Sequence, residues 1–422
     1  LADHPVAPTD EELLMADPIA DITLQDLVRP EILADPYPLF RRLRAEAPVH
    51  QDPVGQAWMV SRYADAVSVL GNPSFSANLI TPRGDTESRI DTVPGMLRRQ
   101  LILIDPPDHT RLRGLFARTM TPARVESLRL HALETATRLL DAADKTSTID
   151  FIAEFAAIMP ITVIARLIGI SESDLHLLRN WSVSFGKLLG GSAITAGEYL
   201  ESRDSVLDFI EYCEALIKVR RLDPVDDLLS DLVRIEAEGD RISIDELVSN
   251  LILLVVAGHG TVTHLIGNGL IALHRHPDQW RLLGNDPAIV PGAVTEMLRY
   301  DGPVQTAVRD AREDVEIGGR LISKGQRVVV ILGSANRDER QFDEPDRLDV
   351  CRTGTRLLSF GYGIHACIGA MLGRMEAQVS FGEIARRFPN FSIETNQPDW
   401  SPEVNFRGVS SLPVRLGKSR PA

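Results

Sequence analysis

The sequence has little cysteine: its 422 residues include only Cys213, Cys351 and Cys367. Three isolated cysteines cannot form the disulfide framework of a small secreted protein, and they fit a reducing compartment. There is also no run of about 20 apolar residues, so the sequence predicts no membrane anchor. The first residues lack the basic and apolar regions of a signal peptide. We therefore expect a cytoplasmic protein.

The sequence also has fewer basic residues than acidic residues. Lysine and arginine number 45 against 59 aspartate and glutamate residues, which gives a formal net charge of −14. Such an excess of negative charge repels phosphate backbones, so it excludes a nucleic-acid-binding role for the whole molecule. No internal repeat or linker divides the chain. We expect a loosely ordered segment over residues 1–24, which is acidic and contains proline, followed by a single domain over residues 25–422.

A glycine-rich stretch near the C-terminus is the most informative part of the sequence. Residues 360–369 are Phe-Gly-Tyr-Gly-Ile-His-Ala-Cys-Ile-Gly, and a helical pattern follows from residue 371. The glycines let the backbone approach something flat or bulky, and a helix start favours a thiolate at Cys367. Such a thiolate is a strong single ligand for a metal. A glycine-rich turn around a buried cysteine is the simpler interpretation, and a cysteine hydrolase that uses Cys367 and His365 is another.

Two cations share one face of a helix that is predicted to begin at Asp108. The sequence Asp-Pro-Pro-Asp at 105–108 ends the preceding segment, and His109 and Arg113 are four residues apart. Paired cations suit an anionic group such as a carboxylate, although a solvated basic face has the same spacing. Six arginines against two aspartates over residues 98–124 reverse the overall charge. This reversal favours docking of an acidic redox protein, and scattered surface arginines are the alternative.

A long apolar helix is predicted from about Ser243 to His276, with a capping box at its start and a proline just after its end. Residues 251–257 are all apolar, so we expect this helix to be buried on every side. Gly258 and Gly260 lie in its middle, where each glycine costs about 1 kcal/mol relative to alanine. Either close contact with another helix or a local opening of the helix at a functional site would explain them.

These segments resemble the motifs of the cytochrome P-450 monooxygenases, and they occur in that family's order. Residues 360–369 match the family's haem-ligand loop, Phe-Gly-x-Gly-x-His-x-Cys-x-Gly, at every specified position, and residues 105–113 match its propionate-binding helix. The resemblance covers about Asp35 to Leu416. It implies a mainly α fold with a small β region, in one large domain of the soluble bacterial type. It also implies haem b as the cofactor, with Cys367 as the axial ligand of the iron.

The resemblance assigns roles to further residues. Phe360 would pack over the sulfur, and two glycines would let the backbone approach the cofactor: Gly361 and Gly369. Four side chains would bind the haem propionates: His109, Arg113, Arg309 and His365. Three residues would form the oxygen-binding groove: Ala257, Gly260 and Thr261. Five would line the substrate pocket: Val304, Gln305, Ala307, Asn405 and Phe406. A buried structural network would consist of Glu296, Arg299 and Arg347.

Two irregular segments would cover the substrate pocket in the resembled family. Residues 72–93 contain scattered proline, glycine, serine and aspartate without a period, and a loop of this length inside a domain is usually functional or mobile. Residues 190–192, Gly-Gly-Ser, interrupt a helical pattern and predict a turn between two helices.

The predicted groove departs from the family at one position. The family has an acid immediately before the threonine, which helps to relay protons, and this chain has Gly260 there. Water held by the helix, the substrate itself or a nearby imidazole would have to substitute. His259 and His264 are the candidate imidazoles, although a histidine on a buried helix more often has a structural role. An atypical oxidation, such as radical coupling or peroxide use, is therefore the alternative to ordinary monooxygenation.

The resemblance implies an enzyme that inserts one oxygen atom of O2 into a C–H or C=C bond. Its electrons would come from NAD(P)H through a ferredoxin reductase and a ferredoxin. Its substrate would be a mostly apolar small molecule, such as a polyketide, terpenoid or steroid that is modified in secondary metabolism. A haem-binding sensor or carrier without turnover is the alternative from another class of protein.

Overall fold

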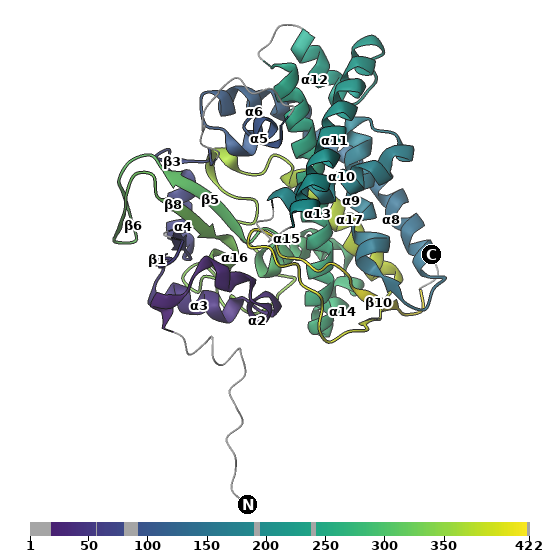
Figure 1. Ribbon diagram of the computed structural model, residues 1–422. Helices are drawn as coiled ribbons and strands as arrows, with labels where there is room; N and C mark the ends of the chain where they lie inside the picture. The colour runs from purple at the N-terminus through teal and green to yellow at the C-terminus, as the bar shows by residue number, and fades with distance from the viewer. Residues whose placement is uncertain (1–17, 56, 80–91, 190–194, 238–241, 420–422) are drawn as a thin grey trace, which may run out of the picture.

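The computed structural model describes residues 18–55, 57–79, 92–189, 195–237 and 242–419. Figure 1 shows a large helical part packed against a smaller part that contains the principal sheet. A mainly α fold with a small β region, as the sequence predicts, is confirmed. Residues 80–91 and 190–192, which belong to the predicted covers of the substrate pocket, lie outside the described residues.

Eleven of the described α-helices, most of them long, make up the helical part. They are α6 (Asp108–Thr119), α7 (Pro122–Ser127), α8 (Arg129–Ala143), α9 (Ile158–Ile168), α10 (Leu175–Leu189), α11 (Ala196–Leu222), α12 (Leu228–Ala237), α13 (Ile244–Arg275), α14 (Pro277–Asn285), α15 (Val290–Asp301) and α17 (Ala370–Arg387). The shorter helices are α2 (Pro30–Ala34), α3 (Tyr37–Glu46), α4 (Tyr63–Gly71), α5 (Val93–Leu97) and α16 (Leu332–Ala335).

The strands form three small sheets. The largest has the order β1-β2-β8-β5-β3, from β1 (Val49–Gln51), β2 (Trp58–Val60), β8 (Arg327–Ile331), β5 (Thr306–Ala311) and β3 (Phe75–Ser76). A second sheet has the order β4-β10-β9, from β4 (Ile149–Asp150), β10 (Pro413–Leu416) and β9 (Phe391–Ile393). β6 (Val315–Ile317) pairs with β7 (Arg320–Ile322). β1 and β2 form a hairpin, since Val49 pairs with Val60 in antiparallel register.

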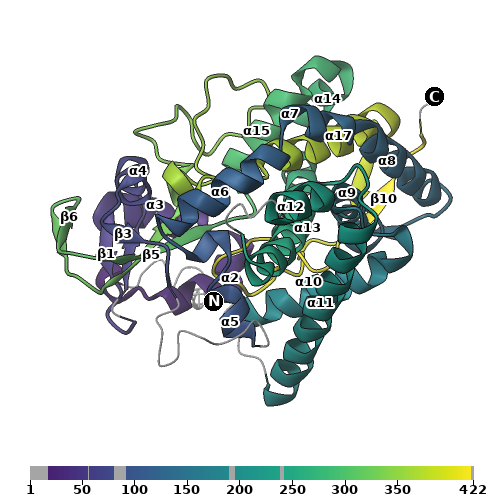
Figure 2. The same cartoon turned by 90° about the horizontal axis from the view of Figure 1, so that it is seen from above.

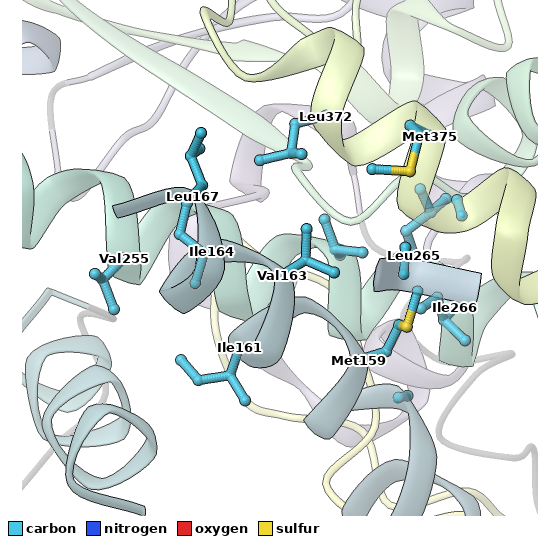
Figure 3. Close-up of a cluster of buried hydrophobic side chains, with 14 of the residues drawn as sticks. Met159, Ile161, Val163, Ile164, Leu167, Val255, Leu265, Ile266, Leu372 and Met375 are labelled. Atoms are coloured by element: carbon cyan, nitrogen blue, oxygen red, sulfur yellow. The ribbon is translucent and has the colours of Figure 1, made fainter. Parts of the chain in front are cut away.

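Helix α13 organises the helical part, and α9, α10 and α11 gather around it (Figure 2). Its predicted capping box is present: the Ser243 hydroxyl accepts from the Glu246 N–H, and the Glu246 carboxylate accepts from the Ser243 N–H at 2.8 Å. Apolar side chains of α13 pack against those of α9 and α17 (Figure 3). A Cβ added to Gly373 of α17 would lie 3.4 Å from Val262, so the first half of α17 lies against the middle of α13.

The packed part of the chain begins before residue 25, where the sequence analysis placed the start of the domain. Ile22 is only 1% exposed, and its carbonyl oxygen lies 2.8 Å from Nε2 of His50. Ile22 belongs to a small core with α3 residues such as Leu39 and Leu43. The acidic composition of residues 1–24 concealed this apolar anchor.

By length and composition, α13 is the one helix of the described chain that could cross a membrane. Its most apolar 18-residue window is 61% buried inside the protein, as expected for the central helix of a core.

Candidate active site

The loop that carries Cys367 is closed by its own backbone. The N–H of Cys367 donates to the carbonyl oxygen of Phe360 at 2.8 Å, and the N–H of Ala366 donates to that of Gly363 at 3.1 Å. Gly361 and Gly363 have φ angles of 69° and 73°, which glycine adopts readily and other residues resist. Helix α17 begins three residues after Cys367, as the sequence predicts.

Two glycines bring this loop against the end of α4. A Cβ on Gly363 would lie 2.7 Å from the carbonyl oxygen of Leu70, and a Cβ on Gly71 would lie 3.1 Å from the Tyr362 ring. Side chains at these positions would therefore push the loop away from α4. The sequence motif includes Gly363, but nothing in it indicates that Gly71 is its counterpart.

The thiol of Cys367 is accessible yet lies deep among protein atoms. Burial raises its pKa above the ordinary value, and this outweighs the opposing effects of the Gly369 N–H and the Arg113 charge. A helix start was expected to favour the thiolate, but burial has the larger effect on the pKa of the free thiol. A metal ion bound to the sulfur reverses this balance because a coordinated thiol loses its proton.

Four basic side chains gather beside the loop, as predicted. The rings of His109 and His365 lie 4.1 Å apart between centroids, and burial followed by the neighbouring His109 lowers the pKa of His365 to about 3. Burial and the Arg113 and Arg309 charges lower the pKa of His109, and Asp105 is the acid that opposes them. Arg309 is 9% exposed and donates to the carbonyl oxygen of Val308 at 2.7 Å.

This cluster fits the two propionates of haem. Both ring nitrogens of His109 are buried and find no hydrogen-bond partner among the described residues, which is costly for polar atoms. Arg309 and Arg113 have no carboxylate partner in the described chain. Carboxylates placed between these groups would satisfy the orphaned imidazole and neutralise the guanidinium charges. The donor set and the Cys367 sulfur are therefore complementary to a haem.

Helix α13 carries the predicted groove. The hydroxyl of Thr261 donates to the carbonyl oxygen of Ala257 at 2.7 Å, one turn back, and the helix runs unbroken through both glycines. Of the two explanations for the glycines, helix contact holds for Gly258, where a Cβ would touch Ile164 at 3.4 Å. Gly260 has no such contact, because no atom lies within 4 Å of an added Cβ.

The prediction that α13 is buried on every side was wrong in this stretch. Ala257 is exposed, and Val256, Gly260 and Thr261 are half-buried. These residues form a continuous stripe along one side of the helix, so their apolar character serves a binding surface and not only a core.

Replacing Gly260 with alanine should stabilise the protein. We expect the free energy of unfolding to rise by about 1 kcal/mol, because alanine favours the helix and nothing obstructs the added methyl group. Gly258→Ala is the matched control, and its gain should be smaller because the methyl group meets Ile164. Denaturant unfolding of both variants provides the measurement. Equal gains would show that steric contact does not distinguish the two positions.

The two candidate imidazoles have different surroundings. Nδ1 of His259 lies 2.9 Å from the hydroxyl of Ser182 on α10, and the ring is buried. His264 packs so closely on the C-terminal turn that a Cβ on Gly408 would lie 1.9 Å from its Nδ1. Burial lowers the pKa of each histidine to about 4, so both are neutral at pH 7.

The predicted pocket residues come together where the C-terminal turn meets the start of β5. The Gln305 N–H donates to the carbonyl oxygen of Asn405 at 2.9 Å, and Val304 pairs with Phe406 in a β-bridge. The turn reaches α13 through the His264 contact with Gly408. Val304, Phe406 and also Ala307 are half-buried, and Phe406 lines a pocket with Leu27, Phe40 and Trp400.

Two of the predicted pocket residues direct their polar groups elsewhere. Gln305 is 6% exposed, and its side-chain amide donates to the carbonyl oxygen of Gly302 at 2.7 Å while it packs on Gly333. The side-chain oxygen of Asn405 accepts from the Thr306 hydroxyl at 2.7 Å. The suggestion that Gln305 faces the pocket is therefore corrected: its side chain supports the pocket wall from behind.

The buried network contains Glu296 and Arg299 as predicted, but its third side chain was assigned wrongly. The Glu296–Arg299 pair, at 2.7 Å, is fully buried, and Nε of Arg352 donates to Glu296 at 3.1 Å. The side chain of Arg347 is 60% exposed and pairs with Glu344, and only its backbone carbonyl joins the network by accepting from Arg299. Arg352 lies five residues further along the same irregular segment.

Three arginines of the stretch 98–124 pair with acidic side chains in three dimensions. Arg111 pairs with Glu246, Arg124 pairs with Asp231 at 2.7 Å, and Arg99 lies 3.7 Å from Asp245. Arg113 turns inward and donates to the carbonyl oxygen of Ala366. The paired state of these side chains favours the alternative of separate surface arginines over a single strongly positive docking patch.

Comparison with known proteins agrees with this geometry. The model of the cytochrome P450 family matches residues 288–415. Putative cytochrome P450 133B1 of Xylella fastidiosa is 37% identical over 399 residues, which cover 93% of this chain and 98% of the relative. The structure of P450BioI with a fatty-acid-ligated acyl carrier protein is similar, with a TM-score of 0.86 at 31% identity over 92% of this chain and 99% of that one. The polyketide synthase cytochrome P450 PksS of Bacillus subtilis has a TM-score of 0.84 at 33% identity, over 93% and 99%.

The chain belongs to the cytochrome P450 family. It is a haem-thiolate monooxygenase, an oxidoreductase with the single-domain fold of the bacterial members. This excludes a haem-binding sensor without turnover and a cysteine hydrolase. The His365 ring packs against His109, as expected if both residues bind a propionate.

Proposed function

We propose that this enzyme inserts oxygen into a C–H or C=C bond of a mostly apolar small molecule, in the tailoring of a secondary metabolite such as a polyketide. We further propose that NAD(P)H supplies its electrons through a ferredoxin reductase and a ferredoxin, in the cytoplasm. The observation that carries the substrate class is that four residues assigned to the groove and the pocket, Ala257, Val304, Ala307 and Phe406, are apolar and at least partly accessible.

We expect each residue of the site to have a distinct role in binding the haem, the oxygen or the substrate. Cys367 would hold the haem iron, and His109, Arg113, Arg309 and His365 would hold its propionates. When bound, the haem activates O2 for insertion of one oxygen atom, and a thiolate ligand favours cleavage of the O–O bond. Thr261 would hold a proton at its hydroxyl oxygen beside the reacting oxygen. The apolar wall would exclude water and hold a C–H bond in place.

The comparisons support a polyketide-like substrate without identifying it. PksS is described as an enzyme of bacillaene polyketide synthesis, and P450BioI was solved with a fatty acyl chain on its carrier protein. A hexadecenoyl chain is long and largely apolar, which agrees with the apolar residues assigned to the pocket here. Either a free molecule or one attached to a carrier protein is compatible with this surface.

A ligand titration tests the substrate class. We expect one class among macrolides, steroids, terpenoids, fatty acids and cyclic peptides to shift the haem absorption of the purified ferric protein. With a ferredoxin system, NADPH and labelled O2, that ligand should gain one labelled oxygen atom by mass spectrometry. A polar ligand class that binds while every apolar class fails would contradict the proposal.

A second candidate function rests on Gly260. An acid normally precedes the groove threonine in this family, and α13 has no acidic residue from 251 to its end. An oxidation that needs no relayed protons from the protein, such as radical coupling or peroxide use, would tolerate this loss. A product that forms without incorporation of labelled O2 would favour this candidate.

A further inference from the structure

An open space lies beside Gly260 of α13. No atom lies within 4 Å of a Cβ built on Gly260, whereas Gly258 is in contact with Ile164. The space adjoins the accessible stripe of Val256, Ala257 and Thr261, so it is continuous with the proposed substrate surface. A ligand in the pocket can therefore extend a group toward Gly260.

Helix α10 packs against α13 (Figures 1 and 2). Ser182 fixes the contact, because its hydroxyl lies 2.9 Å from Nδ1 of His259, the residue before Gly260. Arg179 precedes Ser182 by three residues, so it lies on the same face of α10. Burial is the main cause of the lowered pKa of His259, and the Arg179 charge lowers that pKa further.

Arg179 has no anionic partner within the described part of the chain. It is half-buried, and it forms no hydrogen bond or ion pair with a described residue. Nearby arginines of α11 are paired: Arg220 with Asp227 at 2.7 Å and Arg221 with Glu236 at 2.8 Å. In a chain with 59 acidic against 45 basic residues, a half-buried arginine without an acid is a position where a ligand can supply the missing charge.

We propose that Arg179 and the open space at Gly260 form a subsite for a carboxylate of the bound substrate. The subsite rests on the proposed function, since the carboxylate belongs to an otherwise apolar molecule held by the same wall. Its position beside Thr261 also gives the substrate's own acidic group the place that an acidic side chain occupies in relatives. Arg179 acts as a specificity-determining residue: it selects an acid over the corresponding neutral molecule.

Binding of decanoic acid and decanamide to the haem-loaded enzyme at pH 7.5 tests the subsite. At this pH the acid is fully ionised, and the two molecules have nearly the same shape. By calorimetry and haem absorption we expect the acid to bind at least tenfold more tightly. Arg179→Met should remove this preference and leave amide affinity within twofold of the original. Lys187→Met, which removes an exposed charge from the same helix, should preserve the preference.

Gly260→Asp provides an independent test, because the new carboxylate should occupy the space and pair with Arg179. The ratio of acid to amide affinity should then fall at least tenfold. Equal binding of both molecules to the original enzyme, failure of both to bind, or a preference that survives Arg179→Met would each overturn the subsite. A missing thiolate spectrum with carbon monoxide would instead show that the proposed function fails, so the two failures are distinguishable.

Discussion

Cys367→Ser should abolish the absorption band that a thiolate-bound ferrous haem gives with carbon monoxide, and with it all monooxygenase activity. Cys367 is the sole cysteine of the loop, and the basic cluster beside it would hold a haem against its sulfur. A serine oxygen is a much weaker and harder ligand, so the electron donation that favours O–O cleavage would be lost.

Cys351→Ser is the matched control, because Cys351 is exposed and lies outside the site. Its spectrum and activity should equal those of the original protein. If Cys367→Ser kept the thiolate band, another residue would have to be the ligand and the assignment of the whole site would be wrong.

Arg299→Met should destabilise the protein by about 3–5 kcal/mol, the usual effect of leaving one member of a buried ion pair alone. Glu296 and Arg299 are both fully buried, and Arg299 also donates to the backbone carbonyls of Asn336 and Pro345. The loss would leave the carbonyls of Asn336 and Pro345 without this donor, and Glu296 would keep only the Asp349 N–H and Arg352 as donors. Denaturant unfolding of the haem-loaded enzyme measures the change.

Two further variants test which arginine completes this network. Arg352→Met removes a donor to the buried Glu296 carboxylate, so we expect a loss of about 1–3 kcal/mol. Arg347→Met changes an exposed side chain and should alter stability by no more than about 0.5 kcal/mol. A larger loss from Arg347→Met than from Arg352→Met would restore the assignment made from the sequence.

Features that depend on local spacing could be predicted from the sequence. The Cys367 loop, the start of α6 at Asp108 and the capping box at Ser243 each depend on residues that are close together in the chain. Their geometry follows from turn chemistry and helix periodicity, which are local effects. For the same reason His109 and Arg113 were found from their spacing on one helix face.

Features that depend on contacts between distant segments could not be predicted. Arg347 and Arg352 lie in one irregular stretch, and only the folded chain decides which side chain turns inward to Glu296. Gln305 was predicted to line the substrate pocket, but its side-chain amide donates to the carbonyl oxygen of Gly302. No sequence motif pointed to Arg179, because its proposed role depends on the packing of α10 against α13, about 80 residues further along the chain.

The contact between Gly363 and the Leu70 carbonyl joins segments almost 300 residues apart, and it has a practical consequence. The cofactor loop can take its observed shape only when the end of α4 is already in place. Haem content should thus report on assembly of the β region as well as on the site itself. If variants were screened by their haem absorption, Gly71 would be identified as a haem-binding residue. Its contact is with the loop that binds the cofactor.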